Sequence, residues 1–219
     1  MIFKIKIKID KMPKIAVIGG SGFKNFNKKG IVFLQRHGEG VPPHKIDNKK
    51  NILSLKEQGA EAIVGLSSVG SLKWGIKPGS IVIPHDYINL KNIRTYYDLE
   101  SVHITPGLDE DLRKDIIDAA EKINLNVVKN GVYIQTIGPR LETKAEVNMI
   151  KNYADVVGMT MANEATLAKE QGLRYASICS VDNYAHGITD EEVTYEGIKK
   201  DQEKNKEKIE RLLSELLKD

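Results

Sequence analysis

The chain has very little cysteine and few aromatic side chains. Its 219 residues include one Cys, one Trp and four Phe. The single cysteine, Cys179, cannot form an internal disulfide, and its position in the apolar run YASICSV predicts a packed thiol rather than a nucleophile. Such cysteine usage is typical of proteins kept in a reducing cytosol, so we expect a cytoplasmic protein.

The chain also lacks a dominant charge and a long apolar run. Thirty-three Lys and Arg against thirty Asp and Glu leave a formal net charge of +3, which is too balanced to indicate nucleic-acid binding, and the few aromatic residues offer no base-stacking platform. No apolar run approaches the ~20 residues that a membrane span requires. Residues 2–10 alternate Ile with Lys, unlike the apolar centre of a signal peptide. We therefore expect no nucleic acid and no membrane as partner, and a small anionic substrate fits better.

Strand-like runs alternate with helical stretches along the chain. This alternation predicts a single α/β domain over residues 14–219, with a twisted mixed β-sheet flanked by helices. Residues 1–13 are expected to be an N-terminal extension of unknown role, either an edge strand or a disordered segment ahead of an alternative start at Met12. The expected strands cover residues 14–18, 31–34, 62–66, 80–84, 131–135, 155–157 and 175–181, and the expected helices cover 49–58, 109–122, 143–153 and 163–171.

The last segment is expected to form a terminal helix that packs on the domain. TDEE at residues 189–192 has the pattern of a capping box, and apolar residues recur at helical spacing over residues 209–217. Residues 199–208 contain no apolar side chain, and we interpret their mixed charges as a solvated face rather than a binding patch.

Four short segments rich in small and polar residues come directly after apolar runs. They are GGSG (19–22), QRHG (35–38), SSVGSL (67–72) and GMTMANE (158–164). Loops at the carboxyl ends of strands converge on the ligand in an open α/β sheet, and hydroxyl groups with free backbone N–H groups suit an oxyanion. These turns predict a site for phosphate or a phosphate-bearing partner.

Two common nucleotide-binding motifs and one hydrolase motif are missing. The dinucleotide fingerprint would require Gly at position 25, which is Asn25. No P-loop lysine follows a suitably spaced glycine pair, and GLSSV at residues 65–69 lacks the final Gly of a nucleophile elbow. Nucleotide hydrolysis and serine-hydrolase chemistry are therefore disfavoured.

The segment FLQRHGE brings a guanidinium and an imidazole onto one turn. Arg36 and His37 both suit phosphate oxygens. The same R-H-G motif resembles that of histidine phosphatases, in which the His is the nucleophile. In that family the motif ends the first strand, whereas here a glycine turn and another strand precede it. The histidine phosphatase stays as a remote alternative.

The ordered set of motifs closely resembles the trimeric purine nucleoside phosphorylase and methylthioadenosine phosphorylase family. The matching segments include IAVIGGSGF, RHGEGVPPHKIDNKKNI, LSSVGSL, TIGPRLETKAE, DVVGMTMANEATLAKE and YASICSVDNYA, and the resemblance covers roughly residues 14–217. It implies phosphorolysis of a purine nucleoside, with inorganic phosphate as co-substrate and with neither a metal nor an organic cofactor. It also implies a homotrimer or a hexamer formed by two trimers.

The resemblance assigns roles to individual residues. Asn183 and Glu142 match the positions that read and stabilise the purine, Met159 matches a residue against the base and ribose, and His103 matches a residue that reaches the neighbouring subunit's pocket. Tyr184 and Ala185, next to Asn183, are expected to contact the substrate. The positions that match phosphate ligands are Ser21, Arg36, His37, Ser67, Ser68 and Thr160.

Three positions bear on the choice of base. Adenine-specific members of the family place Asp at the positions of Asn183 and Ala185 and a small hydroxyl residue at that of Glu142. A 6-oxopurine carries a proton on N1 that the Glu142 carboxylate can accept, whereas adenine would present an unprotonated N1 to that buried charge. The Asn183 amide can donate to N7 or to the 6-oxygen as the base leaves. These residues favour hypoxanthine or guanine.

The start of the terminal helix bears on the 5′ group. The resemblance puts Tyr195 at the position where 6-oxopurine phosphorylases commonly place a His that bonds a 5′-hydroxyl, and Ile198 follows one turn later. Tyr195 with Ile198 can pack against a thioether, which favours methylthioinosine. The alternatives are a general inosine and guanosine phosphorylase, a methylthioadenosine phosphorylase and a non-catalytic nucleoside-binding relative.

Overall fold

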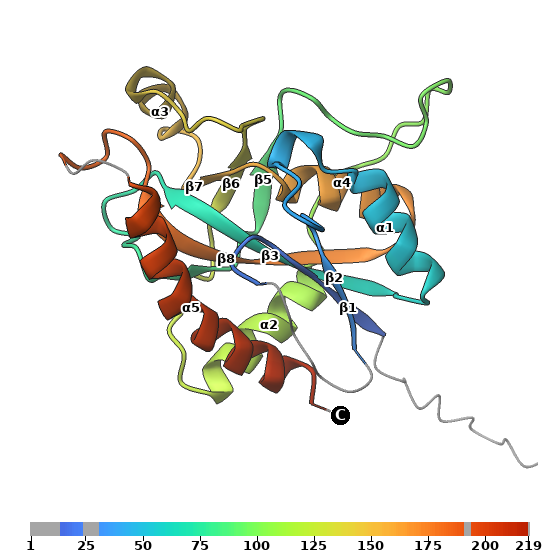
Figure 1. Ribbon diagram of the computed structural model, residues 1–219. Helices are drawn as coiled ribbons and strands as arrows, with labels where there is room; N and C mark the ends of the chain where they lie inside the picture. The colour runs from blue at the N-terminus through green and yellow to red at the C-terminus, as the bar shows by residue number, and fades with distance from the viewer. Residues whose placement is uncertain (1–13, 24–30, 191–193, 219) are drawn as a thin grey trace, which may run out of the picture.

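The computed structural model describes residues 14–23, 31–190 and 194–218, and within them it confirms the α/β architecture. One mixed sheet runs through the molecule, with helices on both faces (Figure 1). Its strands are β1 (Ile15–Gly19), β2 (Val32–Gln35), β3 (Ala62–Ser71), β4 (Ile81–Val82), β5 (Asp86–Ile88), β6 (Val132–Gln135), β7 (Val156–Gly158) and β8 (Arg174–Tyr184). The helices are α1 (Asn48–Glu57), α2 (Glu110–Lys122), α3 (Lys144–Ile150), α4 (Met161–Glu170) and α5 (Tyr195–Leu216), with a short 3-10 helix at Pro43–Lys45.

Strand β3 is at the centre of the sheet and organises it. It runs parallel to β1 and β8, and β1 runs parallel to β2, so that the carboxyl ends of these four strands point the same way. Beyond a register shift at Val69/Gly70, the end of β3 pairs antiparallel with β7. Because β7 runs back along β3, the turn after β7 returns to the turns after β1 and β2.

Alternation along the strands divides the core between two faces. On β1, Val17 packs in a cluster with Leu112 of α2 and Leu212 of α5, whereas Ile18 packs in a cluster with Ile52 of α1 and with α4. Figure 1 shows the same division, with α2 and α5 on one face of the sheet and α1 and α4 on the other. A third, smaller cluster fixes α3 against the end of β3 and β7.

Most predicted elements are confirmed to within a few residues, and the differences concern β3, β4, β5, α3 and the start of α5. The motif SSVGSL is not a turn, because its first five residues continue β3 and pair with β8. Strand β5 was not predicted, the strand expected over 80–84 shortens to Ile81–Val82, and α3 ends at Ile150 rather than at residue 153.

The start of the terminal helix also differs from the prediction. Part of the capping box expected at 189–192 lies outside the described residues, as does the N-terminal extension. Helix α5 begins at Tyr195, and the Thr194 hydroxyl accepts a hydrogen bond from Gly197 N as its N-cap.

Candidate functional site

A cavity of about 690 Å³ opens where the carboxyl ends of β1, β2, β7 and β8 meet. Its wall brings together residues that are far apart in the sequence, from the turn after β1 to the first helical turn of α5. The predicted site residues on this wall are Ser21, Arg36, His37, Glu142, Met159, Thr160, Asn183, Ala185, Ile198 and Ser68. The same cavity therefore holds both the phosphate-type and the purine-type positions.

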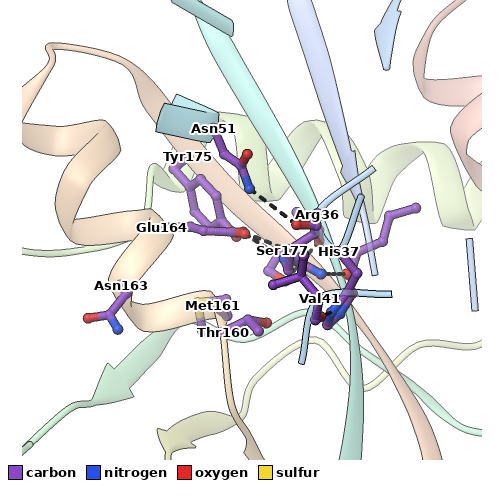
Figure 2. Close-up of polar contacts among 12 residues, drawn as sticks. Arg36, His37, Val41, Asn51, Thr160, Met161, Asn163, Glu164, Tyr175 and Ser177 are labelled. Atoms are coloured by element: carbon purple, nitrogen blue, oxygen red, sulfur yellow. Dashed lines mark hydrogen bonds and ion pairs between the residues drawn. The ribbon is translucent and has the colours of Figure 1, made fainter. Parts of the chain in front are cut away.

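The phosphate-type residues define one end of the cavity, called the phosphate end below. Arg36 is its charged centre and is only 3% exposed. Its Nε donates to Glu164 Oε1 at 2.5 Å and its Nη2 donates to Glu164 Oε2 at 2.8 Å (Figure 2). Its Nη1 donates to Leu66 O at 2.6 Å. The Tyr175 hydroxyl donates to Glu164 Oε2 from behind. Burial opposes the charge of Arg36, but the paired Glu164 more than compensates, so the pKa of Arg36 lies above its ordinary value. Two of its five N–H groups remain for a ligand.

The glycine turn after β1 is shaped by this guanidinium. A Cβ atom at Gly20 would lie 2.8 Å from Arg36 Nη1 and 2.8 Å from Leu66 O. Only a residue without a side chain fits there, which explains why the GGSG turn comes so close to the charge.

His37 follows Arg36 on the same turn and presents a defined tautomer. Its Nδ1 lies 2.8 Å from Val41 O, and because a carbonyl only accepts, Nδ1 carries the proton and Nε2 is left for a ligand. Burial lowers the pKa of His37 below its ordinary value, and the neighbouring Arg36 charge lowers it further. The hydrogen bond to Val41 O acts in the opposite direction.

The turn after β7 carries Met159 and Thr160 into the cavity. The buried Tyr133 hydroxyl accepts hydrogen bonds from Thr160 N at 3.2 Å and from Met161 N at 3.4 Å, which ties the start of α4 to β6. The Met159 thioether lies against Gly138, where an added Cβ would meet Sδ at 2.4 Å. The Thr160 hydroxyl makes no cap bond to α4.

The purine-type residues come from the loop between β6 and α3 and from the end of strand β8. Glu142 is 9% exposed and its Oε1 accepts a hydrogen bond from the Thr136 hydroxyl at 2.6 Å. Asn183, on β8, donates from Nδ2 to Tyr184 O at 2.7 Å. Each of these side chains has one fixed partner, which leaves the second carboxylate oxygen of Glu142 and, on Asn183, the second N–H group and the amide oxygen for other contacts.

Three predicted site residues are absent from the described part of the cavity wall, and the side chain of a fourth is not described. Ser67 is buried, and among the described residues its hydroxyl has no hydrogen-bond partner. The Tyr184 ring stacks on Trp74 at a centroid distance of 5.6 Å. His103 lines a separate cavity of about 480 Å³. Tyr195 begins α5, but its side chain lies outside the described part of the structure. The roles of these four residues stay predictions.

Sequence reasoning missed three polar residues that support the phosphate end: Glu164, Asp182 and Gln202. Glu164 lies inside the motif GMTMANE, but nothing in the pattern distinguished a fully buried ion-pair partner from a helix-surface carboxylate. Gln202 Nε2 donates to Ser68 Oγ at 3.1 Å and to Ser21 Oγ at 3.4 Å. The interpretation of residues 199–208 as a solvated face is therefore wrong for part of that segment, where Asn205 is fully buried.

No helix among the described residues is both long and apolar enough to cross a membrane. The Cys179 thiol is buried, as expected, and burial raises its pKa to about 12.

Comparison with known proteins gives consistent matches over nearly the whole chain. A family model described as the phosphorylase superfamily matches residues 14–218. A probable 6-oxopurine nucleoside phosphorylase of Archaeoglobus fulgidus is 44% identical over 191 residues, which cover 86% of this chain and 79% of that protein. A probable S-methyl-5'-thioinosine phosphorylase of Thermodesulfovibrio yellowstonii is 37% identical, with 80% and 79% covered. The solved methylthioadenosine phosphorylase of Schistosoma mansoni in complex with adenine has a TM-score of 0.84 at 25% identity and covers 93% of this chain and 90% of that one.

Proposed function

Because the chain belongs to the phosphorylase superfamily, we propose that it catalyses phosphorolysis of 6-oxopurine nucleosides in purine salvage. The single observation that carries this proposal is the 690 Å³ cavity, in which phosphate-type residues and purine-type residues line one space. The reaction joins a phosphate oxygen to C1′ of the sugar as the bond from C1′ to the purine breaks. The products are a free base and a ribose 1-phosphate, or the 5-methylthio form of that sugar phosphate.

The chemistry requires charge stabilisation at both ends of the breaking bond. An oxocarbenium-like sugar is stabilised by the bound phosphate dianion, which Arg36, His37, Ser21, Ser68 and Thr160 hold. At the other end, the Asn183 amide stabilises negative charge on the departing base. The proposed reaction needs no covalent intermediate, no metal and no organic cofactor, and phosphate is a co-substrate.

Glu142 supports the choice of a 6-oxopurine. Its Oε1 is held by the Thr136 hydroxyl, so the other carboxylate oxygen is free to accept the N1 proton of hypoxanthine or guanine. Adenine would place a lone pair against this nearly buried charge. The names of the relatives from Archaeoglobus fulgidus and Thermodesulfovibrio yellowstonii agree with this choice. The solved Schistosoma mansoni relative bound adenine, but it is less similar in sequence, so a methylthioadenosine phosphorylase is the second candidate.

The preference for a 5'-methylthio group rests on Ile198. Its side chain lines the cavity at the first turn of α5, where an apolar wall suits a thioether. We therefore propose S-methyl-5'-thioinosine as the substrate, with inosine and guanosine as the alternatives. We also propose a homotrimer, or a hexamer of two trimers, in which His103 reaches the cavity of the neighbouring subunit. His103 lies away from the cavity of its own chain, which supports this arrangement.

A substrate panel tests the proposal directly. The purified protein is incubated with inosine, guanosine, adenosine, methylthioinosine and methylthioadenosine, each with and without phosphate, and free base and sugar 1-phosphate are quantified. We expect cleavage of 6-oxo substrates only with phosphate. Equal cleavage without phosphate would indicate a hydrolase, and a phosphohistidine at His37 would support the histidine phosphatase.

A further inference from the structure

A buried carboxyl group lies behind the phosphate end of the cavity and has no role in the mechanism above. Asp182, on β8, is 1% exposed. The Ser68 hydroxyl of β3 donates to its Oδ2 and the Ser180 hydroxyl donates to its Oδ1. From α5, Gln202 and Asn205 also hydrogen-bond this network. Of these residues, Ser68 is the one that also lines the cavity.

The hydrogen bonds of Ser68 conflict with its role as a phosphate ligand. A serine hydroxyl has one proton and two acceptor lone pairs. The proton is directed to Asp182, and Gln202 Nε2 donates to one lone pair at 3.1 Å. The hydroxyl can therefore offer only its second lone pair to the cavity. A phosphate dianion would meet a lone pair there, with an ionised carboxylate directly behind it, and both repel an anion.

We propose that Asp182 takes up a proton when an anion such as phosphate binds at Ser68. The neutral carboxyl then donates to Ser68 Oγ, and Ser68 turns its own proton toward a phosphate oxygen. For the dianion the proton comes from solvent, and for the monoanion it comes from the phosphate itself, so that in both cases the bound species is a dianion beside a neutral carboxyl. Asp182 is a positioning residue, because it acts through Ser68. This inference rests on the proposed function in one respect, the placement of phosphate at Ser68.

The surroundings of Asp182 make this proton uptake feasible near neutral pH. Its four hydrogen-bonding neighbours, Ser68, Ser180, Gln202 and Asn205, are neutral. Burial raises its pKa to about 6, against the ordinary 3.8, although these hydrogen bonds oppose the shift. The neighbouring Cys179 thiol on β8 is neutral, because its own pKa is raised to about 12.

Among the described residues, no charged side chain hydrogen-bonds Asp182 directly. On α5, Lys208 Nζ donates to Gly79 O at 2.7 Å and to Asn205 Oδ1 at 3.3 Å, which places its charge behind Asn205. Arg36 and His37 line the same cavity as Ser68. A bound dianion beside Ser68 would favour the neutral carboxyl further, since like charges oppose each other's ionisation.

The experiment uses sulfate, a tetrahedral dianion that does not titrate near neutral pH. Sulfate is titrated calorimetrically into the wild-type protein and into Asp182→Asn at pH 7.5, in two buffers of different ionisation enthalpy. In Asp182→Asn the amide oxygen accepts from Ser180 and the amide nitrogen donates to Ser68, which reproduces the neutral acid. We expect the wild type to take up about one proton per site more than the variant when sulfate binds. Measured over a series of pH values above pH 6, the ratio of the wild-type sulfate Kd to the variant's Kd should rise about tenfold per pH unit.

His37 also titrates, but it is unchanged in both proteins, so the difference between them isolates Asp182. Ser68→Ala provides a second comparison that keeps the carboxyl group, and it should bind sulfate more weakly without the extra proton uptake. Equal proton uptake by the wild type and both variants, or no sulfate binding at all, would overturn the inference. Phosphorolysis is assayed separately on the wild type: activity without extra proton uptake refutes only the role of Asp182, whereas proton-linked sulfate binding without activity refutes only the proposed function.

Discussion

At the scale of single residues, the ion pair between Arg36 and Glu164 has two roles that a simple alanine substitution would mix. Arg36 lines the phosphate end, and it also neutralises a fully buried carboxylate. We expect Arg36→Met to lower the free energy of unfolding by ~3–5 kcal/mol, because Glu164 is left buried without a partner. Urea unfolding measures this loss.

The double variant Arg36→Met with Glu164→Gln separates the two roles. It removes the unpaired charge and should recover much of the lost stability, while the KM for phosphate stays raised as in the single variant. If the single variant unfolds at the wild-type urea concentration, the pair does not stabilise the fold in the way the buried geometry indicates.

Asp182 gives a pH-dependent prediction for the protein without bound anions. Its pKa is raised in the folded state to about 6 from the ordinary 3.8, so the folded state binds more protons than the unfolded state between these values. Stability from this group is therefore present at low pH and is lost as pH rises toward 6. Asp182→Asn should be more stable than the wild type at pH 7.5, by up to ~3 kcal/mol, with a smaller gain at pH 4.5. Urea unfolding at both values tests this, and a gain independent of pH would contradict it.

Three positions on the cavity wall, Glu142, Asn183 and Ala185, test the proposed choice of base. We expect the wild type to prefer methylthioinosine over methylthioadenosine by ~100-fold or more in kcat/KM, since a mismatched buried polar contact supports discrimination of this size. The triple variant Glu142→Ser, Asn183→Asp and Ala185→Asp should shift the preference toward adenine. It removes the N1 acceptor and adds carboxyl groups, which accept from the 6-amino group when ionised and protonate N7 when in the acid form. Glu142→Ala alone should lower activity on 6-oxo substrates only.

At the scale of helices and strands, the sequence predicted the sheet better than the polar contacts of its helices. Buried strands and amphipathic helices follow apolar periodicity, so β1, β8 and α2 are found near their predicted bounds. The middle of α5 contains no apolar residue, yet Asn205 and Gln202 turn inward because β8 and β3 present Ser180 and Ser68 to them. Apolar periodicity gives no signal for such polar burial.

Alternation along β3 separates two neighbouring serines that the motif treats alike. Successive side chains of a strand point to opposite faces. Ser68 therefore reaches the cavity wall, whereas the adjacent Ser67 side chain is buried. The sequence predicted SSVGSL as a turn, in which no such alternation applies, so it gave no reason to distinguish the two hydroxyls that the family resemblance assigns to phosphate.

The short helix α3 supports the loop that carries Glu142. Thr143 and Glu146 form a capping box at its start, and Arg140 pairs with Glu146. We expect Thr143→Ala to lower the free energy of unfolding by ~1 kcal/mol and to raise the KM for nucleoside more than the KM for phosphate. Steady-state kinetics with each substrate varied in turn measures the split. Asp109→Ala removes the N-cap of α2, which does not line the cavity, and should cost stability without changing the ratio of the two KM values.

At the scale of the whole molecule, apolar side chains gather on the segment before α2. Leu90, Ile93, Leu99 and Val102 are 81%, 58%, 100% and 41% exposed. This segment also lines the second cavity, with His103 among its residues. Large exposed apolar groups close together are typical of protein interfaces. They support the proposed trimer, whose mass in solution would be three times the 24.5 kDa of one chain, or six times for two trimers.

Mixed assemblies test whether one chain completes the site of the next. Glu142 lies in the cavity of its own chain, whereas His103 is proposed to serve a neighbour. We expect His103→Ala and Glu142→Ala each to lower activity when alone. In a random one-to-one assembly of the two variants, about a quarter of the sites would combine an intact Glu142 with an intact His103 from the neighbour. Co-expressed variants carrying different affinity tags should therefore regain about a quarter of the wild-type activity. The matched control mixes His103→Ala with a chain that carries both His103→Ala and Glu142→Ala, so that no assembly contains an intact His103. Activity equal to the mean of the two parents would show that His103 does not act across a subunit boundary, and the proposed interface would then need a different orientation.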